Sequence, residues 1–356
     1  MLGTSFSEWL GLGILAVVAV VVLGVAVWMA VGLYQARSLI RREFTAYFLS
    51  PIAYVVLVFF LAVIGYLFTL TLGELTASGP RGVEFPMQFM LGDQWLFWFV
   101  FLIIPPLLTM RLFAEERGTG TLEMLMTSPL RDWQLVMSKY VACFAFYVIL
   151  WLPTLIFVPV LVDAGPPAWH LLITPWSAGW LVGVAALLLG IILLFVPGGT
   201  DVRVSAIVLL VLGAAATVGG AWAHYTMVEQ HLFEMPARIA SGPMPVVATY
   251  LGLVLAGAML LAIGLFVSSL VRNQLVAALV SVALGLAFII PGFVLPYLDS
   301  GSGLYRTLFF VSIPQHFSHD FCRGLIDTRH VTLYTSVMVF SLFLTVRSLE
   351  SRRWRS

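Results

Sequence analysis

The feature that most constrains this 356-residue chain is a series of long apolar runs. A helix needs roughly 20 apolar residues to cross the hydrocarbon core of a bilayer, and these runs are of about that length. Because backbone groups in lipid must be hydrogen-bonded within their own segment, unbroken runs of this kind favour helices. Hydrophobic residues make up 61% of the chain and its mean hydropathy is +1.03, well above the values of soluble domains. The sequence therefore predicts an all-α, polytopic membrane protein.

Nine such runs predict nine spans, at about residues 12–33, 52–72, 95–110, 140–162, 176–196, 204–222, 246–270, 275–295 and 331–346. The first run resembles a signal peptide in length. It has no basic region before it and no A-x-A cleavage site after it, so a true span is the better interpretation.

Orientation follows from the basic residues near the span ends, which accumulate on the cytoplasmic side. With the C-terminus inside, thirteen basic residues lie on the inner side: Arg37, Arg41, Arg42, Arg111, Arg117, Arg131, Lys139, Arg203, Arg272, Arg347, Arg352, Arg353 and Arg355. The outer side then holds five: Arg81, Arg238, Arg306, Arg323 and Arg329. We therefore expect a multi-pass protein of the cytoplasmic membrane with its N-terminus outside and its C-terminus in the cytoplasm.

Residues 36–49, between the first two predicted spans, have the pattern of an amphipathic helix. The apolar residues recur at i, i+4, i+7 and i+8: Ile40, Phe44, Tyr47 and Phe48. The basic residues fall elsewhere on the helix: Arg37, Arg41 and Arg42. This pattern predicts a helix that lies in the membrane interface against lipid.

The stretch from Met110 to Lys139 is a long polar interruption that holds eight charged residues in a chain that is only 10% charged. Gly118 and Gly120 permit a sharp reversal of the chain. Residues 121–127 then place three apolar side chains on one face of a short helix: Leu122, Leu125 and Met126. Ser128 and Pro129 are typical of an N-cap and first position of the next helix. A mixed-charge knob with apolar anchors suits docking onto a soluble partner, and a solvated hairpin without a partner is the open alternative.

Four segments of the chain resemble a known family. They are RREFTAYFLSPIAYVVL (41–57), the segment 106–139 containing TMRLFAEERGTGTLEMLMTSPLRDW, LLAIGLFVSSLVRNQLVAA (260–278) and the C-terminal segment 321–354. Together they are similar to ABC transporter permeases of the type-2 export class. The resemblance is closest to the gliding-motility, GldF-like branch, with the permease NosY as a relative.

The resemblance implies a six-span core, a connecting helix at 36–50, and a coupling helix at about 119–127 that docks onto a separate cytoplasmic ABC ATPase. The docking residues that it carries over are Glu115, Glu116, Arg117, Gly120, Thr121, Leu122, Glu123, Leu125, Ser128, Pro129 and Asp132. In the connecting helix it points to Arg37, Arg41, Arg42, Phe44 and Tyr47. The second permease of the complex is expected to be another copy of this chain or a paralogue.

The resemblance also divides the chain. Residues 51–175 correspond to core spans one to three and residues 246–356 to core spans four to six with an external loop at 296–330. Residues 1–35 form an additional N-terminal span, and residues 176–245 form an inserted two-span hairpin followed by an external loop. These three additional spans depart from the family pattern.

Several function classes are disfavoured by the residues. The only lysine, Lys139, follows a serine, so no Gly-Lys-Ser/Thr phosphate loop exists, and ATP and Mg²⁺ are expected on the partner ATPase. Cys143 and Cys322 form no disulfide framework or metal quartet. The chain has no basic stripe for nucleic acid, and ionisable residues are scarce within the spans, which argues against a proton- or sodium-driven carrier.

Three polar groups suggest sites. The His316, His319 and Asp320 group could hold a metal, although packing of the loop is the favoured interpretation, as it is for His224 and His231. The Glu115–Glu116 pair lacks a nucleophile or histidine nearby, so pairing between helices or contact with a partner is favoured over catalysis. We predict no catalytic, cofactor or metal residue.

The sequence thus predicts the non-catalytic permease subunit of an ATP-driven exporter-like complex. The alternative is a subunit that passes ATPase motion to an extracytoplasmic partner without moving a substrate. A membrane-embedded hydrolase or acyltransferase is disfavoured, because no Ser/His/Asp cluster lies near a membrane face.

Overall fold

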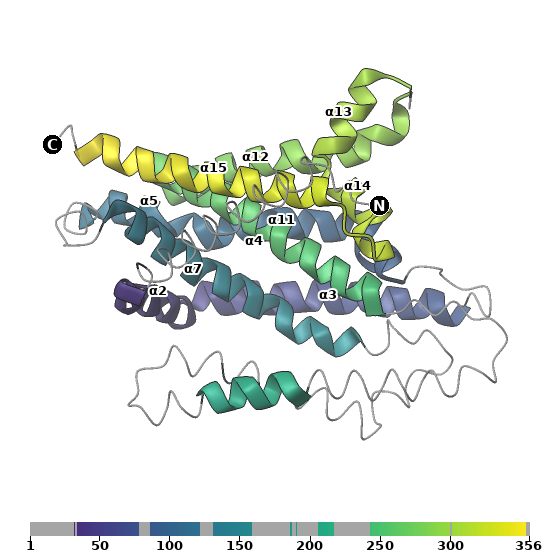
Figure 1. Ribbon diagram of the computed structural model, residues 1–356, viewed down its shortest axis with the longest axis horizontal. Coiled ribbons are helices and arrows are strands. Elements are labelled where there is room, and N and C mark those ends of the chain that lie inside the picture. The colour runs from purple at the N-terminus through teal and green to yellow at the C-terminus, as the bar shows by residue number, and fades with distance from the viewer. Residues whose placement is uncertain are drawn as a thin grey trace, which may run out of the picture.

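The computed structural model describes residues 32, 34–77, 86–121, 131–158, 186, 190, 206–216, 243–299 and 301–353 (Figure 1). In these ranges the chain forms α-helices with short 3₁₀ and π segments, and it forms no strand. The prediction of an all-α membrane protein is confirmed: within the described part of the chain, six helical segments are long and apolar enough to cross a membrane.

The six segments run back and forth along one bundle axis (Figure 1). They are built on α3 (Pro51–Ala77), α4 (Trp95–Thr109), α7 (Asp132–Trp151), α11 (Pro243–Leu270), α12 (Gln274–Val294) and α15 (Thr328–Arg353). Short elements extend two of them: α5 (Arg111–Thr119) follows α4, and the 3₁₀ helix η3 (Leu152–Phe157) follows α7. These are the six spans that the resemblance assigned to the core.

The three additional spans of the sequence prediction are not tested. Nearly all of residues 12–33 and of residues 176–196 lie outside the described residues. Within 204–222 the structure describes one apolar helix, Ala206–Ala216, which is shorter than a span.

Several boundaries differ from the sequence prediction. The first core helix runs to Ala77 instead of 72, and the polar connection after it contains a π-helix, η2 (Gln88–Gly92). The helix predicted to begin at Pro129 begins at Asp132, because Arg131 is extended (φ −74°, ψ 146°). The backbone N–H of Arg131 donates to Gln134 Oε1 at 3.0 Å, and this contact caps the start of the helix.

Helix α11 occupies the centre of the bundle and contacts α15, α4, α12 and α7. Small residues let its neighbours approach closely, as expected for helices that pack in lipid. The ring of Tyr147 fills the space that a side chain at Gly257 would need, and the Tyr147 hydroxyl donates to Leu253 O at 3.0 Å. Tyr140 likewise donates to Ala258 O at 3.0 Å. These contacts make α7 and α11 a closely packed pair, although the two helices are far apart in the sequence.

The two ends of the bundle differ in character (Figure 1). One end, called here the charged end, consists of α2 (Arg37–Leu49), α5 and residues 131–139 of α7. The opposite loop end consists of η2, α13 (Gly303–Val311), α14 (Ile313–His319) and the 3₁₀ helix η6 (Phe321–Arg323). At the loop end Ser318 Oγ donates to Asp93 Oδ1 at 2.8 Å and Arg323 Nε donates to Gln88 Oε1 at 3.1 Å, so η2 is joined to the segment before α15.

Candidate functional site

Helix α2 is held against the bundle at the charged end by one buried face. Phe44 and Tyr47 are buried, and the Tyr47 ring stacks on Phe146 of α7 with 5.1 Å between ring centroids. The Tyr47 hydroxyl donates to Leu108 O at 2.9 Å. Burial raises the pKa of Tyr47 well above its usual value, so this hydroxyl remains a donor. The basic residues of the helix lie outside this face: Arg37 and Arg42 are exposed and Arg41 is half-buried.

Lys139 joins three elements of the charged end. Its side chain is only 1% exposed, and its Nζ lies 2.6 Å from Glu116 Oε1 of α5 and 3.3 Å from Glu43 Oε1 of α2. Glu43 also pairs with Arg42 at 2.9 Å. Because a buried charge is strongly unfavourable without partners, this lysine fixes α5 and α2 to the start of α7.

A second set of contacts fixes α5 to the end of α11. Ser268 Oγ accepts the backbone N–H groups of Phe113 and Ala114, each at 3.1 Å, and donates to Met110 O at 3.1 Å. Arg117 Nη1 donates to Ser269 O at 2.6 Å and to Val271 O at 3.3 Å. The Arg117 guanidinium is favourable at the C-terminal end of α11, because the last carbonyl groups of a helix lack intrahelical partners and carry partial negative charge.

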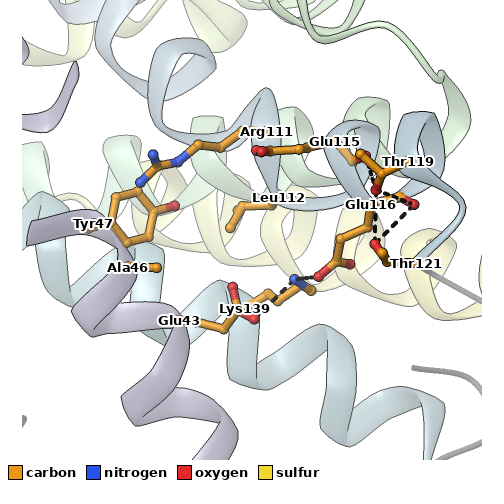
Figure 2. A pocket seen from close by; sticks show the side chains of 10 residues that line it. All are labelled: Glu43, Ala46, Tyr47, Arg111, Leu112, Glu115, Glu116, Thr119, Thr121 and Lys139. Carbon is orange, nitrogen blue, oxygen red and sulfur yellow. Dashed lines mark hydrogen bonds and ion pairs between the residues drawn. The ribbon is translucent and has the colours of Figure 1, made fainter. Parts of the chain in front are cut away.

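A partly open cavity of about 410 Å³ lies between α2, α5 and α7 (Figure 2). Its lining residues are Glu43, Ala46, Tyr47, Arg111, Leu112, Glu115, Glu116, Thr119, Thr121 and Lys139. Figure 2 shows Arg111 beside Tyr47 on one side and Thr119 and Thr121 on the other. The Arg111 guanidinium carbon lies 4.5 Å from the centroid of the Tyr47 ring, within the range of a cation–π contact. A space of this size falls within the roughly 300–1,000 Å³ typical of ligand sites.

The far end of α5 forms a turn at the mouth of this cavity. Gly120 has φ +76°, a left-handed conformation that glycine adopts without strain, as the sequence predicted for a sharp reversal. Thr119 Oγ1 donates to Glu115 O at 3.0 Å and lies 3.0 Å from Thr121 Oγ1. After Thr121 the next described residue is Arg131. The structure therefore describes the predicted coupling helix, 119–127, only from Thr119 to Thr121.

A family model described as ABC-2 family transporter protein matches residues 84–271, which is more than half of the chain. The chain belongs to the ABC-2 transporter family. No curated protein and no solved structure matches it. The matched range contains α4, α5, α7 and α11, and hence the Lys139–Glu116 pair and the contacts of Ser268. The protein is therefore a multi-pass permease subunit of the ABC transporter type, and such permeases normally work with a cytoplasmic ATPase, often as dimers.

The docking residues predicted for this ABC-2 permease separate into groups. Glu115, Glu116 and Thr121 line the cavity, whereas Arg117 points to the end of α11. Asp132 is the first residue of α7. Five others lie outside the described residues: Leu122, Glu123, Leu125, Ser128 and Pro129.

Sequence reasoning did not assign roles to four residues that organise the charged end: Glu43, Arg111, Lys139 and Ser268. For Lys139 a signal existed, because it is the one lysine of the chain and it stands at the start of an apolar run. For the other three, only the packing of the helices reveals the contact.

The second candidate site of the permease, at the loop end, is a packed histidine pair. His316 Nδ1 lies 2.8 Å from Tyr334 Oη and its Nε2 lies 3.1 Å from Phe309 O, so both ring nitrogens have partners. The ring stacks on His330 with 3.7 Å between centroids, and His330 Nε2 lies 2.8 Å from Asp320 Oδ2. Burial and the neighbouring His330 lower the pKa of His316 to about 3.

Among the described residues no group of three or more His, Cys, Asp or Glu side chains is arranged to hold a metal ion. His224 and His231 lie outside them. The contacts of His316 are those of a residue that packs its own loop.

Proposed function

We propose that this ABC-2 permease couples a separate cytoplasmic ABC ATPase to export across the cytoplasmic membrane. The turn after α5, with the coupling segment 119–127, is the docking element. ATP and Mg²⁺ are bound by the ATPase and not by this chain. In this proposal the charged end faces the cytoplasm, in agreement with the distribution of arginines, and the permease is most similar to the GldF-like branch that is related to NosY.

The observation that carries the proposal is the double attachment of α5. This nine-residue helix continues from the α4 span, is joined to α7 and α2 through Lys139, and is joined to α11 through Ser268 and Arg117. A displacement at residue 120 therefore cannot be absorbed by α5 alone. It moves the ends of several spans together, which is the rigid-body type of switching expected in a packed helical bundle.

The complex is proposed to contain two permeases, this chain with a second copy or a paralogue. Large apolar side chains on the outer faces of α3, α12 and α15 are exposed in the single chain, among them Phe59, Leu279 and Phe340. Lipid or the second permease would cover these faces.

A second candidate function is transmission of ATPase motion to an extracytoplasmic partner without export. The polar contacts at the loop end support this alternative. Because Ser318–Asp93 and Arg323–Gln88 join η2 to the segment before α15, the loop end can move as a unit and present one surface to another protein.

The experiment that tests the proposal is affinity purification of the chain in mild detergent, with mass spectrometry of the co-purifying proteins. Recovery of an ATPase with a phosphate-binding loop is the expected result. Recovery of the chain alone, even after crosslinking from Thr121→Cys, would contradict the proposal. An extracytoplasmic protein in the same complex would favour the transmission alternative.

A further inference from the structure

The cavity at the charged end holds one carboxylate, that of Glu115, without an ion pair among the described residues, whereas Glu43 pairs with Arg42 and Lys139 and Glu116 pairs with Lys139. Of its lining residues three are carboxylates and two are cations. Lys139 is already neutralised by Glu116 and Glu43, and it is buried, so it has little attraction left for an anion. Arg111 is directed toward Tyr47 on one side of the cavity (Figure 2).

Glu115 is the cavity carboxylate that is open to a cation from outside the chain. Its side chain is exposed at the edge of the cavity and forms no ion pair within the described part of the chain. Nearby, Glu116 uses Oε1 for Lys139, whereas its Oε2 is buried and has no hydrogen-bond partner. The hydroxyl groups of Thr119 and Thr121 add two oxygen acceptors on the same side (Figure 2).

A cation with several N–H groups would satisfy the Glu115 carboxylate and the threonine hydroxyl groups together. Guanidinium and ammonium groups are the protein side chains with this chemistry, and guanidinium in particular binds carboxylates through two parallel hydrogen bonds.

We infer that this cavity receives a basic side chain, arginine or lysine, from the surface of the partner ATPase. The inference rests on the proposed function and names the chemistry of the docking contact. The position of the cavity supports it, because the cavity is lined by α2 and by Thr119 and Thr121 on either side of Gly120, in the first residues of the proposed coupling segment. The entering side chain would contact α2, α5 and the Glu116–Lys139 pair at once.

The test uses the complete permease in detergent and the purified ATPase, with their affinity measured at low and high salt. We expect Glu115→Gln to weaken binding about tenfold at low salt and Glu115→Lys to weaken it further, because charge pairs at the edge of an interface govern association and its salt dependence. Both differences should shrink at high salt. Glu350→Gln is the matched control, since it removes one partly exposed carboxylate near the end of α15, where Glu350 pairs with Arg347 at 2.6 Å.

The partner side chain is identified with a photo-crosslinking amino acid at Ala46, which is exposed and lines the cavity. The expected product is an ATPase peptide that contains arginine or lysine. Changing that residue to glutamate should weaken binding to the unmodified permease and restore binding to the Glu115→Lys variant.

The outcomes separate this inference from the proposed function. If the unmodified permease binds the ATPase but Glu115→Lys binds equally well at low salt, the cavity inference is wrong and the proposed function stands. Crosslinks from Ala46 that reach only lipid or the permease itself would overturn the inference in the same way. If the unmodified permease binds no ATPase, the proposed function fails and this inference with it.

Discussion

Replacing Lys139 with methionine is the most informative perturbation of the charged end. Methionine keeps an unbranched side chain of similar length and removes the ammonium group that joins α7 to α5 and α2. The change leaves Glu116 and Glu43, whose side chains are 17% and 13% exposed, without their shared cation. Removing one partner of a buried ion pair typically costs about 3–5 kcal/mol, because the remaining charge stays buried.

This cost predicts a large fall in thermal stability. At about 2 °C per kcal/mol for a chain of this size, Lys139→Met should lower the Tm of the purified permease by roughly 6–10 °C. The assay is thermal unfolding in detergent, followed by tryptophan fluorescence. We also expect the ATPase to remain bound to the variant while its stimulated turnover falls, because the coupling segment is unchanged and only its attachment to the spans is weakened.

The double variant Lys139→Met/Glu116→Gln serves as the control. It removes the carboxylate that the first change leaves alone, while Glu43 retains Arg42 as a partner at 2.9 Å. Residues in one ion-pair network show interaction energies of about 0.5–3 kcal/mol, so the double variant should recover part of the lost Tm. A Lys139→Met protein with unchanged Tm and unchanged stimulated turnover would refute the claim that this lysine links the three elements.

Three further predictions concern other parts of the structure. Gly257→Leu should lower the free energy of unfolding by about 1–3 kcal/mol, and with it the Tm, because the new side chain would overlap Tyr147. Gly65→Ala is the comparison: its new methyl group would meet no atom within 4 Å, so the Tm should be nearly unchanged. Ser268→Ala should cost about 1–3 kcal/mol in thermal unfolding, since two backbone N–H groups lose their acceptor; Ser269→Ala, whose hydroxyl bonds only within its own helix at Phe266 O, is the comparison. Finally, stability should fall as pH drops from about 6.5 toward 3, because in this window the unfolded chain binds a proton at His316 that the folded chain excludes. His316→Gln should flatten this part of the Tm–pH curve, and an identical curve for both proteins would contradict the assignment.

The elements that could be predicted from the sequence depend on local signals. Hydropathy locates the six core spans, and the 3.6-residue period locates α2 and its buried Phe44 and Tyr47. The turn at Gly120 follows from the conformational freedom of glycine. Each of these signals can be seen within a window of about 20 residues. The start of α7 lies at Asp132, three residues after the predicted Pro129, and the Gln134 side chain that accepts the backbone N–H of Arg131 there was not recognised in the sequence.

The contacts of the charged end are of a different kind. Lys139 pairs with Glu116, 23 residues earlier, and with Glu43 on another element, while Ser268 lies more than 150 residues from the N–H groups that it accepts. No local pattern determines such pairs. They depend on how α2, α5, α7 and α11 pack against one another at the charged end of the bundle.

The triplet Glu115-Glu116-Arg117 shows why a sequence motif does not correspond to a single surface. Successive residues of a helix are rotated by about 100°, so three consecutive side chains cover more than half of its circumference. On α5 they consequently have three different roles: Glu115 faces the cavity, Glu116 pairs with Lys139 of α7, and Arg117 donates to carbonyl groups at the end of α11. Loss of coupling after Arg117→Ala would therefore be caused by a loosened contact between α5 and α11, and it would not by itself identify a docking residue. Glu115, whose side chain is exposed, is the position at which a change of charge reports on the partner and not on the fold.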